Sequence, residues 1–187
     1  MTDPWQMLVI LLLAANPAGA AAQMASLRRK HEGSQAVVAG TGLAAAIVAV
    51  VVAAVVAQPL FDMLDVQPPT FRIAAGIALA LQGVQMTWRG AAVVHASPDG
   101  WQAGVYPLAI PLVAGPGLLA LVLNWRIDPE GGWIVLAVAL PAVVISALAG
   151  AFAPAGWRPI YSALARATGA VVIVTAAALI VDGVQSV

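Results

Sequence analysis

The chain contains no cysteine, and only 9% of its 187 residues are charged, with eight basic and eight acidic side chains. The absence of cysteine excludes disulfides, thiolate nucleophiles and cysteine-ligated metals. The zero net charge gives no support for nucleic-acid binding. With 62% hydrophobic residues and a mean hydropathy of +0.96, the chain has too little polar surface to cover a soluble globule. We therefore predict a membrane protein.

The apolar residues fall in blocks and do not alternate as they would in barrel strands. Each block approaches the roughly 20 residues that a helix needs to cross about 30 Å of hydrocarbon. We therefore expect an all-α fold of six transmembrane helices in a single domain covering residues 1–187. The expected helices cover residues 5–26, 36–60, 71–88, 103–125, 133–152 and 161–184, joined by short polar connections.

The segment LLLAANPAGAAAQM at residues 11–24 is compatible with two structures, a cleaved signal peptide and a retained helix that is broken in the membrane. A signal peptide has its positive charges before the apolar region, whereas here Arg28, Arg29 and Lys30 follow it. The pattern favours a retained first helix. The first, third and fifth connections are also richer in Lys and Arg than the others, so the positive-inside rule places both termini outside.

Two blocks contain helix-breaking residues at equivalent places, near the middle of the first block and of the fourth. Proline cannot donate a backbone hydrogen bond, and its ring crowds the preceding turn. The carbonyl groups freed in this way must be satisfied by protein, water or ligand when they lie in lipid. A single proline is also compatible with an ordinary kink, but the fourth block has a proline between two glycines. The breaks comprise Asn16, Pro17 and Gly19 in the first block and Gly115, Pro116 and Gly117 in the fourth.

The two halves of the chain, about 1–95 and about 96–187, look like repeats of three helices. The sequence Gln82-Gly83-Val84-Gln85 in the third block is echoed by Asp182-Gly183-Val184-Gln185 in the sixth. Because three is an odd number, the second copy must enter the membrane from the opposite side, which makes the repeat inverted. Similarity by chance among Ala, Gly and Val residues also explains the short motif, so the paired breaks carry more weight.

Inverted repeats with paired broken helices are typical of secondary transporters that work by alternating access. The N-termini of half-helices attract an anion, and freed carbonyl groups can accept from an ammonium group or bind a cation. H+ and Na+ are the candidate coupling ions. A small zwitterionic solute suits both, which makes the break residues the candidate substrate site. Gln82 and Gln85 either line the pathway or bond between helices. Asp182 is a candidate for proton coupling, with a water-exposed helix end as the alternative.

The segments VYPLAIPLVAGPG, ANPAG, FRIAAGIAL and RATG...VDGVQ resemble the MarC family of integral membrane proteins, across essentially the whole chain. The resemblance implies a multi-pass protein of a prokaryotic cytoplasmic (inner) membrane that is related to the LysE-type exporters. It also implies small neutral amino acids, of the alanine, glycine and serine type, as substrates. The chain departs from the family pattern at Ala20, where the family often has asparagine, and at Ala75, where a second glycine is common.

Other functions receive less support from the sequence. No HExxH, GxSxG or glycine-rich phosphate loop is present, and no pair of acids lies at membrane depth, so we expect neither an enzyme nor a cofactor or metal. An exporter of another small metabolite or drug is an alternative, as is a non-transporting scaffold that binds a second membrane protein. The small residues of the second block would serve either internal packing or a homo-oligomer.

The predicted topology can be tested by cysteine accessibility, since the wild-type chain has no cysteine and every variant then carries one reactive site. Cysteines at positions of Ser34 and Ser97 should be labelled from the cytoplasm, and those at Asp65 and Glu130 from outside. An intact mass that shows a mature chain beginning near Ala22 would instead establish signal-peptide cleavage.

Overall fold

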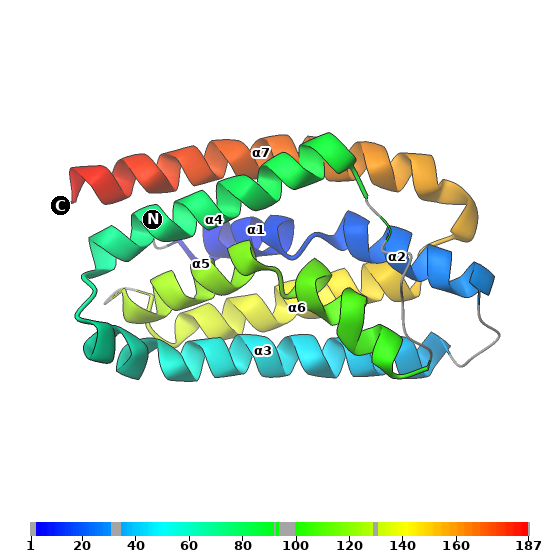
Figure 1. Ribbon diagram of the computed structural model, residues 1–187, viewed down its shortest axis with the longest axis horizontal. Coiled ribbons are helices and arrows are strands. Elements are labelled where there is room, and N and C mark those ends of the chain that lie inside the picture. The colour runs from blue at the N-terminus through cyan, green and yellow to red at the C-terminus, as the bar shows by residue number, and fades with distance from the viewer. Residues whose placement is uncertain (1–2, 31–34, 92, 94–99, 129–130, 187) are drawn as a thin grey trace.

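The computed structural model describes residues 3–30, 35–91, 93, 100–128 and 131–186, and within these ranges the chain is helical and has no strands. The helices lie along a common long axis and form one bundle (Figure 1). In chain order the elements are α1 (Pro4–Ala14), α2 (Pro17–Lys30), α3 (Gln35–Leu64), α4 (Pro68–Arg89), η1 (Gly104–Val113), α5 (Pro116–Ile127), α6 (Ile134–Ala151), η2 (Ala155–Trp157) and α7 (Arg158–Gln185).

Four stretches of the described chain are long and apolar enough to cross a membrane, and η1 together with α5 gives a fifth. The four are Pro4–Leu27, α3, α6 and α7. The remaining helix of the six expected is the third, residues 71–88, which corresponds to α4; it has 22 residues but falls outside this set. Its arginines and glutamines, Arg72, Gln82, Gln85 and Arg89, lower its mean hydropathy. The chain is thus a helical multi-pass membrane protein in which α4 is the most polar of the long helices.

Both predicted helix breaks are present. α1 ends at Ala14 and α2 begins at Pro17, and Asn16 between them has a φ of 49°. This is the left-handed conformation, which asparagine adopts more readily than most other residues. In the second half, η1 and α5 are separated by Ala114 and Gly115, and their axes differ by 60°.

The helix η1 is itself irregular, which the sequence-based block of residues 103–125 does not describe. The segment is kinked, and Tyr106 and Ile110 within it have extended backbone angles, with φ near −129° and −121°. Each of these residues precedes a proline, whose ring crowds the preceding residue and disfavours the helical conformation there. The backbone is therefore disturbed at two prolines before it reaches the break at Gly115.

Helices α4 and α7 pack antiparallel and very closely along their length (Figure 1). A Cβ atom on Gly83 would lie 2.9 Å from the carbonyl oxygen of Gly169, and one on Gly76 would lie 3.1 Å from that of Ala176. Small residues at such positions let two membrane helices approach backbone to backbone. They recur at intervals of seven residues, as Gly76, Gly83 and Gly90 on the α4 side and Gly169, Ala176 and Gly183 on the α7 side.

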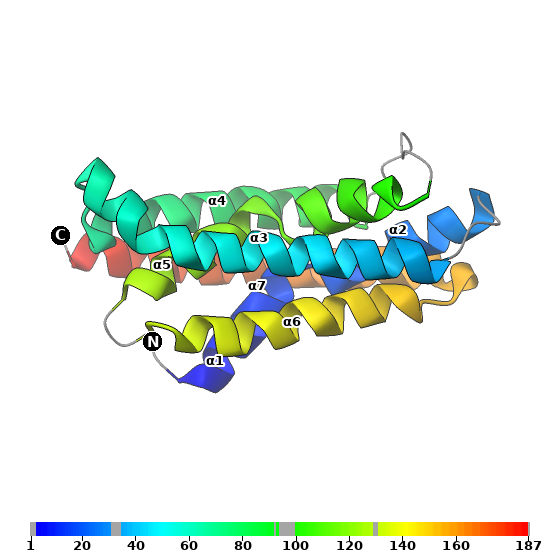
Figure 2. The same ribbon diagram turned by 90° about the horizontal axis from the view of Figure 1, so that it is seen from below.

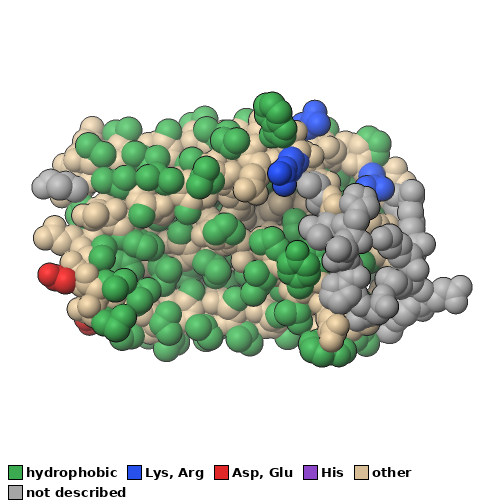
Figure 3. Space-filling model, viewed as in Figure 1, with side chains coloured by type: hydrophobic (Ala, Val, Ile, Leu, Met, Phe, Trp, Pro, Cys, Tyr) green, Lys and Arg blue, Asp and Glu red, His purple; other side chains and the backbone are tan. Residues whose placement is uncertain are grey.

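Charged side chains lie toward the two ends of the bundle. On the face shown in Figure 3, acidic side chains lie at one end, and the Lys and Arg side chains lie toward the other. Helix α1 begins and α7 ends toward the same end, where the connection containing Asp65 also lies (Figures 1 and 2). The two ends of the described chain therefore lie toward the same end of the bundle, and the side of the membrane that they face stays a prediction. The positions predicted at Ser34, Ser97 and Glu130 lie outside the described residues.

The close packing of α4 on α7 predicts a specific sensitivity to added methyl groups. Gly83→Ala should lower the free energy of unfolding by about 1–3 kcal/mol, because the new Cβ meets a backbone oxygen and forces the helices apart. Gly40→Ala is the control, since a Cβ there has no neighbour within 4 Å and should leave stability unchanged or raise it by about 0.5–1 kcal/mol. Unfolding of the purified variants in detergent measures both, and equal effects would contradict the packing role.

Candidate functional site

A cavity of about 470 Å³ lies between α4 on one side and the two helix breaks on the other. One face of α4 forms most of its wall, and η1, the start of α5 and the break between α1 and α2 complete it. The cavity is lined by Asn16, Ala78, Leu81, Gln82, Gln85, Met86, Arg89, Gly90, Pro111, Leu112 and Pro116. Arg89 is the charged member of this set, and the polar members close to the breaks are amides.

At the first break, Asn16 acts as the N-cap of α2. Its side-chain Oδ1 accepts a hydrogen bond from the backbone N–H of Gly19 at 3.0 Å, and the residue is 8% exposed. Pro17 occupies the first helical position, where the N–H that proline lacks would have no intrahelical partner in any case. Gly19 leaves room for the cap, because a Cβ there would collide with the Asn16 side chain. The break is therefore a properly capped start of a second helix and not a simple kink.

At the second break, α5 begins without a cap from its own N-cap residue, since Gly115 has no side chain. The backbone N–H of Gly117 donates instead to Oε1 of Gln82, at 3.0 Å. Both glycines make room for this amide. A Cβ would lie 3.0 Å from Oε1 if placed on Gly115 and 2.6 Å if placed on Gly117. A side chain from α4 thus supplies the acceptor that the N-terminus of α5 needs.

The other half of the Gln82 amide pairs with the first break. Its Nε2 donates to the backbone carbonyl oxygen of Ala14 at 2.5 Å. Ala14 is the last residue of α1, so its carbonyl has no intrahelical donor. One side chain therefore joins the carboxyl end of α1 to the amino end of α5, and each of its polar atoms meets a backbone group of opposite polarity.

The structure brings most of the predicted site residues together. Asn16, Gln82, Gln85 and Pro116 line the cavity, and Gly117 is hydrogen-bonded to Gln82. The other predicted residues, Pro17, Gly19 and Gly115, shape the backbone of the breaks beside it.

Sequence reasoning missed several members of the α4 wall. Leu81, Met86 and Arg89 line the cavity with the two glutamines. Their positions recur every three or four residues, which is the spacing of one helix face. This spacing could have predicted that Arg89 lines the cavity, because Arg89 lies on the same face of α4 as Gln82 and Gln85.

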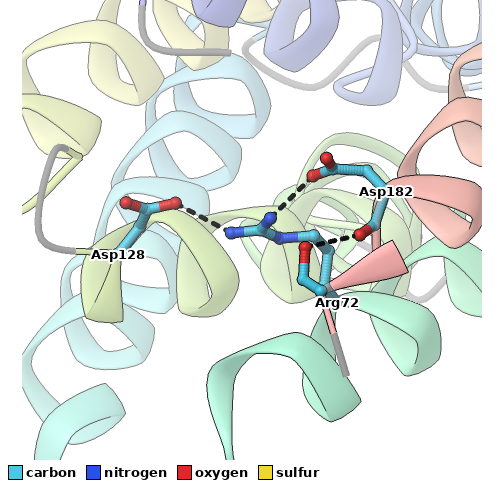
Figure 4. Close-up of polar contacts among 4 residues, drawn as sticks. Arg72, Asp128 and Asp182 are labelled. Carbon is cyan, nitrogen blue, oxygen red and sulfur yellow. Dashed lines mark hydrogen bonds and ion pairs between the residues drawn. The ribbon is translucent and has the colours of Figure 1, made fainter. Parts of the chain in front are cut away.

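Asp182 does not lie with the break residues. It pairs with Arg72, whose Nη1 is 2.6 Å from Asp182 Oδ2 and whose Nη2 is 3.0 Å from Asp128 Oδ2 (Figure 4). The Asp182 side chain is 59% exposed, whereas those of Arg72 and Asp128 are 19% exposed. Arg72 precedes Gln82 by ten residues on α4, which corresponds to about 15 Å along the helix. This cluster, Arg72 with Asp128 and Asp182, ties α4 to α7 and to the C-cap of α5.

The comparisons with known proteins agree with this architecture. The family described as MarC family integral membrane protein matches residues 1–187. The UPF0056 inner membrane protein YhgN of Escherichia coli (strain K12) is 28% identical over 134 residues, which make up 68% of each chain. The UPF0056 membrane protein of Buchnera aphidicola subsp. Schizaphis graminum (strain Sg) is 23% identical over 184 residues, 95% of this chain and 94% of the relative. No solved structure matches. The chain therefore belongs to the MarC family of integral membrane proteins.

Proposed function

We propose that this protein is a secondary transporter that moves small neutral amino acids across the inner membrane of a prokaryote. The observation that carries the proposal is the cavity between two broken helices, which amide side chains line where it meets the breaks. The breaks offer backbone donors and acceptors, and the amides of Asn16, Gln82 and Gln85 can donate and accept as well. Alternating access around this cavity would move the solute.

The polar groups at the breaks suit a zwitterion. The N-termini of α2 and α5 carry the positive ends of their helix dipoles, which favour a carboxylate, and the carboxyl end of α1 favours an ammonium group. Arg89 lies seven residues after Gln82, about 10 Å farther along α4, and there it attracts anionic groups toward the cavity. A solute with both charges but no net charge gains from both ends of the site.

Two inverted repeats of three membrane crossings provide the framework for such a transporter, and the spacing of the helices supports them. Each of the first three elements begins 99 or 100 residues before its counterpart in the second half. The matched starts are Pro4 with Gly104 for α1 and η1, Pro17 with Pro116 for α2 and α5, and Gln35 with Ile134 for α3 and α6.

The contacts between α4 and α7 support the same symmetry. A Cβ on Gly83 would meet the carbonyl oxygen of Gly169, and one on Gly183 would meet that of Pro69. The two contacts are equivalent under an offset of 100 residues, because Gly83 then corresponds to Gly183 and Pro69 to Gly169. A two-fold axis between the two helices gives this reciprocity, and it is the axis about which two inverted repeats exchange roles.

Reconstitution in proteoliposomes tests the proposal directly. Flux of glycine, alanine and serine should be measured for the parent and for Gly117→Val and Asn16→Ala at matched protein levels. Gly117→Val should reduce flux to background, because its Cβ would lie 3.2 Å from the backbone Cα of Leu79 and its methyl groups would fill the space beside the Gly117 N–H. Asn16→Ala should lower flux, because it removes an amide that lines the cavity and a cap worth about 1 kcal/mol to the start of α2. Val51→Ile on α3 is the control and should retain flux.

Unchanged flux in both break variants would refute the proposed site. A parent that transports none of the three amino acids would point to a different exported solute. Recovery of the protein only within a larger complex, again without flux, would favour the scaffold.

The candidate role of Asp182 in proton coupling makes a separate prediction. Asp182→Asn should abolish uptake that is driven by a proton gradient, while exchange of labelled for unlabelled glycine continues, since exchange needs no net proton movement. Asp62→Asn is the control, because Asp62 is an exposed acid whose Oδ1 accepts a hydrogen bond from Gln58, four residues earlier on α3. Equal loss of driven uptake and exchange would instead assign Asp182 the structural role of holding α7 to Arg72.

A further inference from the structure

The Gln82 amide holds the two backbone groups that a zwitterionic substrate would need. Its N–H group donates to the Ala14 carbonyl oxygen at 2.5 Å, and its carbonyl oxygen accepts from the Gly117 N–H at 3.0 Å. An α-amino acid presents the same two functions, with an ammonium donor at one end and a carboxylate acceptor at the other. The side chain therefore has the polarity of the proposed substrate and occupies the place where its charged groups would bind.

The dimensions of the site also match. In an amide one carbon separates the donor nitrogen from the acceptor oxygen, and in an α-amino acid two carbons do so. A pair of backbone groups bridged by one amide is therefore within reach of one small amino acid. The surroundings select against bulk, because a Cβ on Gly117 would already lie 3.0 Å from a methyl carbon of Leu79. The adjoining cavity of about 470 Å³, which Gln82 itself lines, provides space for the displaced side chain.

We propose that Gln82 is a built-in occupant of the substrate site, and that a small neutral amino acid binds by displacing its amide. The substrate carboxylate then accepts from the Gly117 N–H, and its ammonium group donates to the Ala14 carbonyl oxygen. This inference rests on the proposed function. It explains how the empty site avoids two unpaired backbone groups, which are costly in a medium of low dielectric constant. Binding then exchanges one pair of hydrogen bonds for another.

A permanent strut is the competing role for Gln82, and the two roles predict opposite effects of its removal. If Gln82 competes with the substrate, the site is free for only a fraction of the time, and the apparent affinity is reduced by that fraction. Removing the amide then strengthens binding. If Gln82 is a strut or a direct ligand, its removal weakens binding.

Equilibrium dialysis of labelled glycine, alanine and serine against the purified full-length chain in detergent distinguishes these roles. Gln82→Ala removes the occupant, and Gln82→Asn keeps the amide but shortens its reach by one carbon, so that it cannot bridge both breaks. Val84→Ala is the matched control, because Val84 lies on α4 and is exposed but does not line the cavity. Thermal unfolding of each variant verifies that it is folded.

We expect Gln82→Ala and Gln82→Asn to bind glycine roughly 5- to 100-fold more tightly than the parent, since binding no longer includes release of the occupant. Val84→Ala should bind as the parent does. Weaker or unchanged binding by a folded Gln82→Asn, with the parent binding glycine, would overturn the occupant role and leave the proposed function intact. Absence of binding of all three amino acids to parent and variants would overturn the proposed function, and this inference with it.

Discussion

The structure depends on one constraint, which is that every backbone hydrogen-bonding group in a bilayer must find a partner inside the protein. Two helices of this chain break where they cross, and each break frees groups that a continuous helix would pair. Asn16 satisfies the N-terminus of α2 from within its own segment. Gln82 satisfies the end of α1 and the start of α5 together, from a third helix. These two amides stabilise the breaks, because they supply hydrogen-bond partners to backbone groups that would otherwise be unpaired away from water.

Helix α4 therefore organises the bundle. Its glycines permit the close approach of α7, Gln82 holds the start of α5, and Arg72 holds the C-cap of α5 through Asp128. The contacts of Gln82 and Arg72 require polar side chains, which explains why α4 is the least apolar of the long helices. The same polar face lines the cavity, so the residues that position α5 also define the chemistry of the candidate site.

Much of this arrangement could be predicted from local sequence. Block lengths located the helices to within a few residues, and proline next to glycine located the breaks, because both signals act over short distances. The cross-helix contacts were not predictable in this way, since Gln82 lies 68 residues from Ala14 and 35 from Gly117 in sequence. The irregular backbone at Tyr106 and Ile110 has a local cause in the proline that follows each of them. The capping of α2 by Asn16 Oδ1 was not predicted, and contact of Asn16 with substrate stays a prediction.

The attachment of α5 at both ends has a mechanical consequence. With 12 residues, α5 is about 18 Å long, and α4 holds it at one end through Gln82 and at the other through the charged contact of Arg72 with Asp128. Loss of the Gln82 contact would leave the charged contact as the polar attachment of α5 to α4, beside the packing of α5 against α3 and α4. A tilt of α5 by roughly 10° about its Asp128 end would move its N-terminus by about 3 Å, which is comparable to the length of a hydrogen bond. A change in one amide contact is thereby converted into a displacement on the scale of a small solute.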